Sequence, residues 1–377
     1  MMTPLRLRFA AGLLTIAAVL LPGHAQDGGQ DAPLRLAIAG LVHGHVAGFL
    51  RAAQGRRDVQ IVGVFEPDAT LRRKYAERYS LPDGVLFDSL ATMLDRVHAE
   101  AVASFTNTAD HPVVVEAAAT RHVAVMMEKP LAVSNAHARR IRIAAERSGI
   151  QVLVNYETTW YANHGGIWTL FKQRGAAGEI RKMVALDGHQ GPKKINVQPE
   201  FLDWLSDPDR NGAGALFDFG CYGANLMTWL MDNRRPVAVT AVTQQFQPEI
   251  YPRVDDEATI LLEYPKAQGI IESSWNWPFN RKDLEVYGDH GSAIATTGGG
   301  ALRVALPNEP DHAVTPDPRS PDERDSISHL LAVVRGKRKP NGLSSLDNNL
   351  IVTEILEAAR ESARTHRRVT LPPDAPR

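Results

Sequence analysis

The sequence predicts an α/β protein with two sheets, a doubly wound parallel sheet near the N-terminus and then an α+β region built on a large, mainly antiparallel open sheet. From Leu34, short apolar runs alternate with longer amphipathic segments, which is typical of β-α-β units. After about Asn155, apolar residues recur at every second position, as in antiparallel strands. The chain has 377 residues, more than the ~100–200 typical of one domain. We therefore expect two domains, over 34–154 and 155–370, preceded by a linker over 26–33.

The strands expected in the first domain are apolar runs bounded by turn residues. They span 34–40, 59–65, 99–105, 122–128 and 150–156. Between them, amphipathic segments predict helices. These span 46–53, 69–79, 89–95, 112–119 and 135–148. The last helix has Ser134 as an N-cap and Gly149 as a C-cap, residue types that favour helix ends.

The second domain is expected to begin with a helix over 164–174 and to continue in successive strands. The strand segments are KMVALDGHQG (182–191), PVAVTAVTQQF (236–246), DEATILLEY (256–264) and AQGIIESSWNW (267–277). Their alternation predicts a sheet with one covered face. A helix over 219–231 interrupts the strands, and a helix over 346–364 ends the domain. The Pro- and Asp-rich segment 306–325 is expected to be a surface loop.

Residues 1–25 have the pattern of a secretory signal peptide. Arg6 and Arg8 precede an uncharged run over 9–21, and a small residue, Ala25, ends the segment. The run is shorter than the ~18 residues needed to span a membrane. We therefore expect a Sec-type signal that is cleaved after Ala25, with an uncleaved anchor as the alternative. The mature protein is expected to be periplasmic or secreted, without membrane contact.

Charge and cysteine content exclude several classes of protein. The formal net charge is −1 at pH 7, without the basic excess that binds nucleic acid, so we expect no nucleic-acid partner. Cys221 is the only cysteine, so the chain can form no internal disulfide. We interpret Cys221 as a small buried residue rather than a nucleophile.

A glycine turn joins the first strand to the first helix in the stretch LRLAIAGLVHGHVAGFL (34–50). A dinucleotide-binding turn needs glycine at three places, for the bend, for the approach of the pyrophosphate and for the contact of helix with strand. Gly40 occupies the first place, but Val42 occupies the second and His45 the third, with Gly44 one position earlier. The helix N-terminus still offers N–H groups to an anion. We therefore expect a Rossmann domain that binds a dinucleotide in an altered manner.

His43 and His45 form a His-X-His pair in this turn, and its chemistry has more than one interpretation. Imidazole is a common metal ligand, but no carboxylate or cysteine lies close to the pair in the sequence. We expect instead a polar turn that hydrogen-bonds its neighbours, together with imidazole N–H groups that face the pyrophosphate. No metal site is predicted.

Charged residues follow two of the predicted parallel strands. Glu66 ends the second strand, where a dinucleotide-binding domain holds the ribose 2′-hydroxyl. A carboxylate there repels a 2′-phosphate, so NAD is the expected cofactor and NADP is less favoured. Lys129 follows strand 122–128 and precedes Pro130, which restricts it to extended backbone. Because ligands of such sheets bind at the carboxyl ends of the strands, Lys129 is a candidate catalytic residue.

Four segments together resemble the Gfo/Idh/MocA oxidoreductases, the family of glucose-fructose oxidoreductase and inositol dehydrogenase. The segments are FTNTADH (105–111), MMEKPLAVS (126–134), GAGALFDFGCYGANLMTWLM (212–231) and ESSWNWPFNRKDLEVYGDHGS (272–292). The similarity extends from about Leu34 to Arg364, with the segments in the family's order. It implies a Rossmann domain followed by a domain that binds the substrate.

The resemblance implies a catalytic group of Lys129, Asp218 and Tyr222. Lys129 would lie beside the nicotinamide and the reacting hydroxyl, Tyr222 would act as acid and base, and Asp218 would orient the substrate. Tyr222 follows Asp218 by four residues, so the two share one helical face. A Lys and Tyr pair with mutually lowered pKa values would suit proton transfer from an alcohol.

The resemblance also implies the cofactor-binding residues. Glu128 would face the nicotinamide ribose, and a loop over 106–111 would line the cofactor, although Asn107 stands where the family has Pro and Thr108 where it has Asn. The full predicted set is Gly40, His43, Gly44, His45, Glu66, Thr106, Thr108, His111, Glu128 and Asn155.

The predicted function is an exported NAD(P)-dependent oxidoreductase that acts on a hydroxyl of a sugar, cyclitol or polyol by hydride transfer. Two alternatives stay open. One is an NAD-assisted glycoside hydrolase or lyase that oxidises C3 transiently, and the other is a non-catalytic sugar-binding homologue with an altered turn. The expected partner is a small-molecule carbohydrate. A homo-oligomer through the second sheet is a further expectation, because an open apolar sheet face seeks cover.

Overall fold

The structure is a computed structural model that describes residues 32–340 and 342–374. The predicted signal peptide over 1–25 lies outside the described residues. Within them, no helix is both long and apolar enough to cross a membrane. From Pro33 onward the chain belongs to one compact unit, and the expected domain boundary between residues 154 and 155 stays a prediction.

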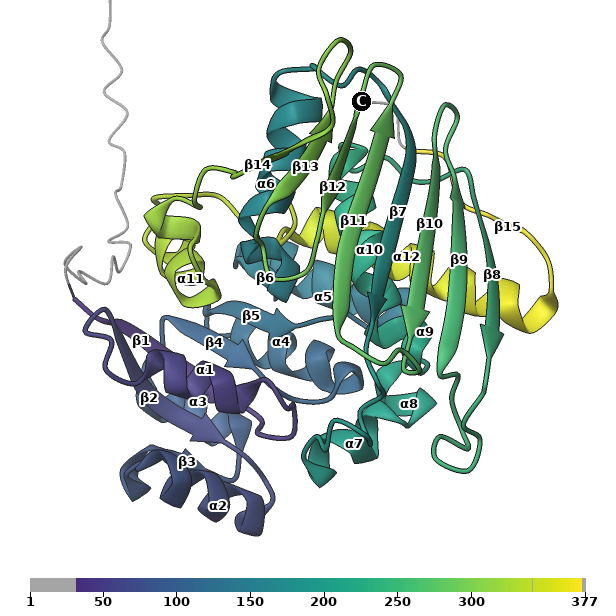
Figure 1. Cartoon of the computed structure of the whole chain (residues 1–377). Coiled ribbons are helices and arrows are strands. Elements are labelled where there is room, and N and C mark those ends of the chain that lie inside the picture. The colour runs from purple at the N-terminus through teal and green to yellow at the C-terminus, as the bar shows by residue number, and fades with distance from the viewer. Residues whose placement is uncertain (1–31, 341, 375–377) are drawn as a thin grey trace, which may run out of the picture. The chain divides into compact units, whose positions relative to one another are not determined.

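A six-stranded parallel sheet occupies the N-terminal part, in the order β3-β2-β1-β4-β5-β6 (Figure 1). Its strands are β1 (Leu34–Ala39), β2 (Val59–Phe65), β3 (Leu86–Phe87), β4 (Ala101–Ser104), β5 (Ala124–Glu128) and β6 (Val152–Asn155). β1 pairs with β2 on one side and with β4 on the other, for example through Leu34↔Val59 and Leu36↔Ala101. The strand order reverses at this point, and open α/β sheets bind their ligands beside such a reversal.

Helices connect these strands. They are α1 (Val46–Ala53), α2 (Ala69–Tyr79), α3 (Leu90–Val97), α4 (His111–Ala119) and α5 (Asn135–Ser148). Ser134 caps α5 by accepting a hydrogen bond from the His137 N–H, and Gly149 ends it with φ 68°. The predicted strands and helices of this region are confirmed. β3 was missed because two residues are too few to show an alternation.

The second sheet has nine strands in the order β14-β13-β12-β11-β7-β10-β9-β8-β15. They are β7 (Ile180–Gly188), β8 (Ala238–Gln244), β9 (Glu257–Glu263), β10 (Gln268–Ser274), β11 (Arg281–Gly288), β12 (Ser292–Ala295), β13 (Leu302–Ala305), β14 (His312–Val314) and β15 (Val369–Thr370). All pairs are antiparallel except β7 with β10. The prediction of a mainly antiparallel sheet is confirmed. β7 and β8 are not neighbours in this sheet. The chain leaves the sheet after β7 and forms several helices before β8, and β10 and β11 later pair with β7 on its two sides.

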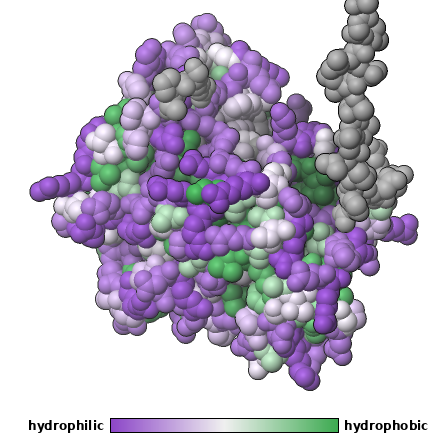
Figure 2. Space-filling model, turned by 180° about the vertical axis from the view of Figure 1, so that it is seen from behind, coloured by the Kyte–Doolittle hydropathy of each residue, from purple (hydrophilic) through white to green (hydrophobic). Residues whose placement is uncertain are grey.

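Helices α10 (Gly220–Leu230) and α12 (Leu346–Thr365) cover one face of this sheet (Figure 1). α10 approaches closely at Gly223, where a Cβ atom would lie 2.7 Å from Ile271 and 2.8 Å from Ala185. The predicted covered face is thereby confirmed. Figure 2 shows the molecule from behind. Hydrophilic side chains cover most of the surface visible in this view, with separate apolar patches between them. The homo-oligomer stays a prediction.

Short elements in the second region were missed by the sequence analysis. They are α7 (Pro199–Leu205), α8 (Pro208–Asn211), α9 (Ala215–Asp218) and α11 (Ser326–Val334). The predicted helix over 164–174 is α6 (Ala162–Trp168), continued by a wider turn over 169–173. The predicted loop over 306–325 contains the edge strand β14. Elements of one or two turns show too few repeats for periodicity to detect them.

Gly40→Ala is expected to destabilise the fold because Gly40 has φ 84° and its Cβ would lie 2.8 Å from the Thr106 side chain. The backbone conformation alone costs a non-glycine residue about 1–3 kcal/mol. Gly48→Ala is the control, since no heavy atom lies within 4 Å of its Cβ position in α1 and Ala favours a helix by about 1 kcal/mol. Denaturant unfolding measures both, and equal stability of the two variants would contradict the argument.

Candidate active site

Lys129 lies buried at the carboxyl end of β5, where the ligand of such a sheet binds. Only 5% of its surface is exposed. Its Nζ donates to Asp218 Oδ1 at 2.5 Å and to the Asp218 backbone oxygen at 2.9 Å. The lysine therefore joins the parallel sheet to the segment that leads into α10.

The Asp218 carboxylate binds protein groups through both of its oxygens, and one of these groups is the Lys129 ammonium. Its second oxygen, Oδ2, accepts from Trp275 Nε1 at 2.9 Å. Both oxygens of Asp218 hold protein groups in this geometry, and its expected role in orienting the substrate stays a prediction. Asp218 is a positioning residue that fixes the place of the Lys129 ammonium.

The ion pair determines the protonation of both partners. Burial alone would lower the pKa of Lys129, but the Asp218 carboxylate outweighs burial and raises that pKa above its usual value. Burial would raise the pKa of Asp218, but Lys129 lowers it. A carboxyl whose pKa falls on folding adds stability above its unfolded pKa of about 3.9, and this is lost as the pH falls through the lower folded pKa.

Tyr222 lies beside Lys129, as the sequence predicted. The centre of its ring is 5.0 Å from Lys129 Nζ, and Tyr156 packs edge-on against it at 5.5 Å. Burial raises the pKa of Tyr222 well above its usual value, with the charge of Glu157 adding to the effect. The expected mutual lowering of the two pKa values is therefore wrong, because Asp218 opposes it at the lysine and burial opposes it at the phenol.

Three polar residues near Tyr222 escaped the sequence analysis. Lys282 of β11 places its Nζ 5.3 Å from the centre of the Tyr222 ring and donates to Glu157 Oε2 at 2.9 Å. Asp187 of β7 is 1% exposed. A signal for Asp187 was present, because it follows Met183 and Ala185 in the buried phase of its strand.

A chain of hydrogen bonds crosses the sheet edge next to Lys129. His45 Nδ1 lies 2.9 Å from Glu128 Oε2, Asn155 Nδ2 donates to Glu128 Oε1 at 2.8 Å, and Trp160 Nε1 donates to Asn155 Oδ1 at 3.0 Å. Burial would raise the pKa of Glu128, but His45 lowers it, so the carboxylate is charged. His45, Glu128 and Asn155 also line a cavity of about 620 Å³.

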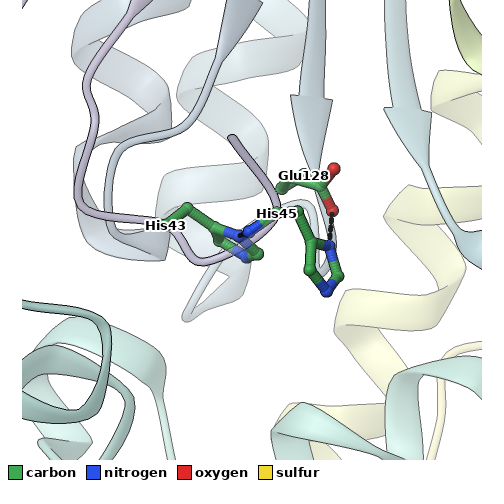
Figure 3. A group of neighbouring side chains, drawn as sticks. All are labelled: His43, His45 and Glu128. Carbon is green, nitrogen blue, oxygen red and sulfur yellow. Dashed lines mark hydrogen bonds and ion pairs between the residues drawn. The ribbon is translucent and has the colours of Figure 1, made fainter. Parts of the chain in front are cut away.

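His43 is buried behind this chain, and its ring packs 4.8 Å from Phe201 and 5.4 Å from Trp204 of α7. Burial lowers the pKa of His43 well below its usual value, and its Nδ1 accepts from the His45 N–H at 3.2 Å. Figure 3 shows the two histidines with Glu128. Their ligand atoms lie within 4.8 Å of one another. No carboxylate lies close to the two histidines in the sequence, but β5 brings the Glu128 carboxylate next to them in the fold. The argument against a metal site that relied on a missing carboxylate is therefore wrong.

The other predicted cofactor residues mainly hold their own loops. Glu66 accepts from the Leu41 N–H at 2.8 Å and from the Asp68 N–H at 3.0 Å. His111 Nδ1 lies 3.1 Å from the Leu131 oxygen, and burial lowers the pKa of His111 to about 4.

Thr106 and Thr108 are also buried, and Thr106 donates to the Asn107 oxygen at 3.1 Å. Gly44 lies against α7, since a Cβ there would be 2.8 Å from the Phe201 ring. The structure therefore brings Gly44, His45, Glu128 and Asn155 to the cavity and places the remaining predicted residues around the turn and loops.

Two family models match the chain. The model described as an oxidoreductase family with an NAD-binding Rossmann fold matches residues 34–156, and the model of the GFO/IDH/MocA C-terminal domain matches residues 172–294.

Curated relatives include trans-1,2-dihydrobenzene-1,2-diol dehydrogenases. The protein from Xenopus laevis is 27% identical, in a match that covers 58% of this chain and 61% of the relative. The protein from Macaca fascicularis is 23% identical, in a match that covers 56% of this chain and 58% of the relative. The match thus spans about three fifths of the length of these relatives.

Solved structures share the fold. The aldose-aldose oxidoreductase from Caulobacter crescentus, complexed with glycerol, has a TM-score of 0.76 and 23% identity over 90% of this chain and 100% of its own. An inositol dehydrogenase homolog from Azotobacter vinelandii, complexed with NAD+, has a TM-score of 0.76 and 19% identity over 90% and 97%.

Asp218→Asn is expected to lower the pKa of Lys129, because it removes the charge that opposes the effect of burial. Loss of one partner of a buried ion pair also destabilises a fold by about 3–5 kcal/mol. The measurement is an NMR titration of protein with ¹³C-labelled lysine, in which Lys129→Met identifies the resonance. Asp255→Asn is the control, because it neutralises a partly buried carboxylate that binds the Gly214 and Leu216 N–H groups instead. A Lys129 titration that does not change in Asp218→Asn would refute the assigned role.

Proposed function

The chain belongs to the GFO/IDH/MocA oxidoreductase family, and from this premise we propose that it is an exported NAD-dependent dehydrogenase of sugars, cyclitols or related polyols. The observation that carries the proposal is the placement of an ammonium and a phenol, Lys129 and Tyr222, next to each other at the carboxyl end of β5. The diol dehydrogenases among the relatives support a hydroxyl-bearing substrate.

Oxidation of an alcohol to a ketone requires acceptors for a hydride and for a proton. Bound NAD supplies the hydride acceptor. Lys129 stabilises the negative charge that develops on the substrate oxygen, because Asp218 keeps it an ammonium. Tyr222 holds its proton at neutral pH and can give it to a carbonyl oxygen in the reductive direction. In the oxidative direction the reverse step requires the Tyr222 phenolate, which receives the alcohol proton and so returns to the neutral phenol, by microscopic reversibility.

The described residues fit a dinucleotide at its nicotinamide end. Glu128 and Asn155 line the cavity beside Lys129, which has room for a ribose. The Glu128 carboxylate is the group that would accept from ribose hydroxyls. Gly40 provides the tight bend that brings the N-terminus of α1 to the same sheet edge.

Helix α7 occupies the surface of the turn where the pyrophosphate end of the cofactor would bind. Helix α7 packs on the turn, with the Phe201 ring against Gly44 and Trp204 Nε1 donating to the Val42 oxygen at 3.2 Å. We propose that α7 gives way as the cofactor enters and then covers it. Such a cover suits an exported enzyme, because a chain secreted unfolded must bind NAD after folding and retain it. The pattern of residues 1–25 supports export.

Lys129→Met is expected to lower kcat by about 10³-fold while the protein keeps its cofactor, because the lysine acts on the reacting oxygen. NAD released by denaturing the purified protein and NADH formation with polyols measure the two properties. The exposed Lys337→Met variant is the control. Wild-type turnover in Lys129→Met would exclude the role. A wild-type protein that releases no nucleotide and whose Tm does not respond to NAD would overturn the proposed function.

Glu66→Gln is expected to raise the affinity for NADP relative to NAD by about 10-fold, since it removes a charge that repels the 2′-phosphate at close range. The amide oxygen can still accept from the Leu41 N–H. Isothermal titration with each cofactor measures the ratio, and the exposed Glu77→Gln variant in α2 serves as the control. An unchanged ratio would place the ribose elsewhere.

A further inference from the structure

A second polar group lies in the C-terminal sheet next to the Lys129 site. Asp187 of β7 stands directly opposite Lys282 of β11 in the antiparallel register. Residues in this relation share a face, with Cβ atoms about 4.5–5.5 Å apart. Both are nearly inaccessible, at 1% and 7% exposure, on the face that α10 covers. Polar side chains in this phase of the strands interrupt an otherwise apolar core.

Lys282 reaches from the sheet to the centre of the site. Its Nζ lies 5.3 Å from the centre of the Tyr222 ring, and Lys129 Nζ lies 5.0 Å from the same point. Glu157 accepts one hydrogen bond from Lys282 and also lines the cavity beside Glu128. An ammonium has three donors, and the bond to Glu157 uses one of them, so Lys282 can donate to a further oxygen near Tyr222.

Asp187 has an unfilled hydrogen-bonding capacity. Its Oδ2 is buried and makes no hydrogen bond within the described residues. Burial raises the pKa of Asp187 well above its usual value, against the charges of Lys282 and Lys129 and together with those of Asp283 and Glu157. Buried oxygens without a partner are rare and costly in native proteins. A hydroxyl of a bound molecule would satisfy this one.

We propose that Asp187 and Lys282 bind substrate hydroxyls adjacent to the one that is oxidised, so that the enzyme selects vicinal polyols over simple alcohols. The inference rests on the proposed function and specifies its substrate class. Lys282 donates to one neighbouring oxygen, and Asp187 forms a hydrogen bond with another hydroxyl. A site built to hydrogen-bond a hydroxyl rejects an analogue without it, because its own polar groups are then left unpaired.

The test compares four probes: myo-inositol, D-glucose, trans-1,2-cyclohexanediol and cyclohexanol. Wild-type holoenzyme is expected to prefer the polyols, and the ratio of kcat/KM for the better polyol to that for cyclohexanol should fall about 10- to 100-fold in Asp187→Leu and Lys282→Met. The fall should appear mainly in KM. Asp187→Asn should restore part of the ratio, since an amide can still form hydrogen bonds. Glu285→Gln, on the opposite face of β11, is the control.

Stability and binding separate the outcomes. A structural role for Asp187 predicts a lower Tm in Asp187→Leu with unchanged selectivity, and this result would overturn the inference. Polyol binding is also measured by isothermal titration, without turnover. Binding by the wild type that Asp187→Leu abolishes, in a protein that oxidises none of the probes, would support the binding of hydroxyls by Asp187 and count against the proposed oxidation. Wild-type protein that binds neither polyol would reject the inference.

Discussion

The buried ion pair of Lys129 and Asp218 is the constraint on which the site depends. It joins the end of β5 to the segment before α10, and Trp275 after β10 holds the second carboxylate oxygen. Two charges removed from water are costly, and only close attraction with full hydrogen bonding offsets that cost. Because burial without Asp218 would favour the neutral amine, the aspartate sets both the place and the charge of the lysine.

The sequence predicted the parallel sheet well because its signals are local. Ser134 and Gly149 mark the ends of α5, and apolar runs mark the strands. The order of the second sheet has no such local signal. Alternation identifies β7 as a strand, but its neighbours β10 and β11 follow only after several helices. Short elements such as α7 and α11 were missed because a few turns carry too little periodicity.

Site residues could be predicted only where the residue type and its position indicated a chemical role, or where the resemblance to the family implied one. Lys129 and Tyr222 were found in this way, and the structure brings them together. The pairing of His45 with Glu128 joins segments 83 residues apart, which no spacing rule could reveal. The turn itself is filled by α7, whose Phe201 and Trp204 pack around His43. The missing glycines of the motif thus coincide with a helix that takes up part of the space.

The balance of charges around Tyr222 bears on what the site can accept. Lys129 is matched by Asp218, and Lys282 is matched by Glu157. Glu128 is matched by His45 only when the imidazole is protonated. Asp187 forms no ion pair within the part of the chain that the structure describes, although Lys282 stands opposite it, and burial favours its neutral form. Carboxylates already neutralise both ammonium groups. An anionic substrate would therefore lose its hydration on binding without gaining an unpaired positive charge, which is unfavourable. Hydroxyl groups need no counter-charge and can use the remaining donors and acceptors, so this balance of charges supports the proposal of an uncharged, hydroxyl-rich substrate.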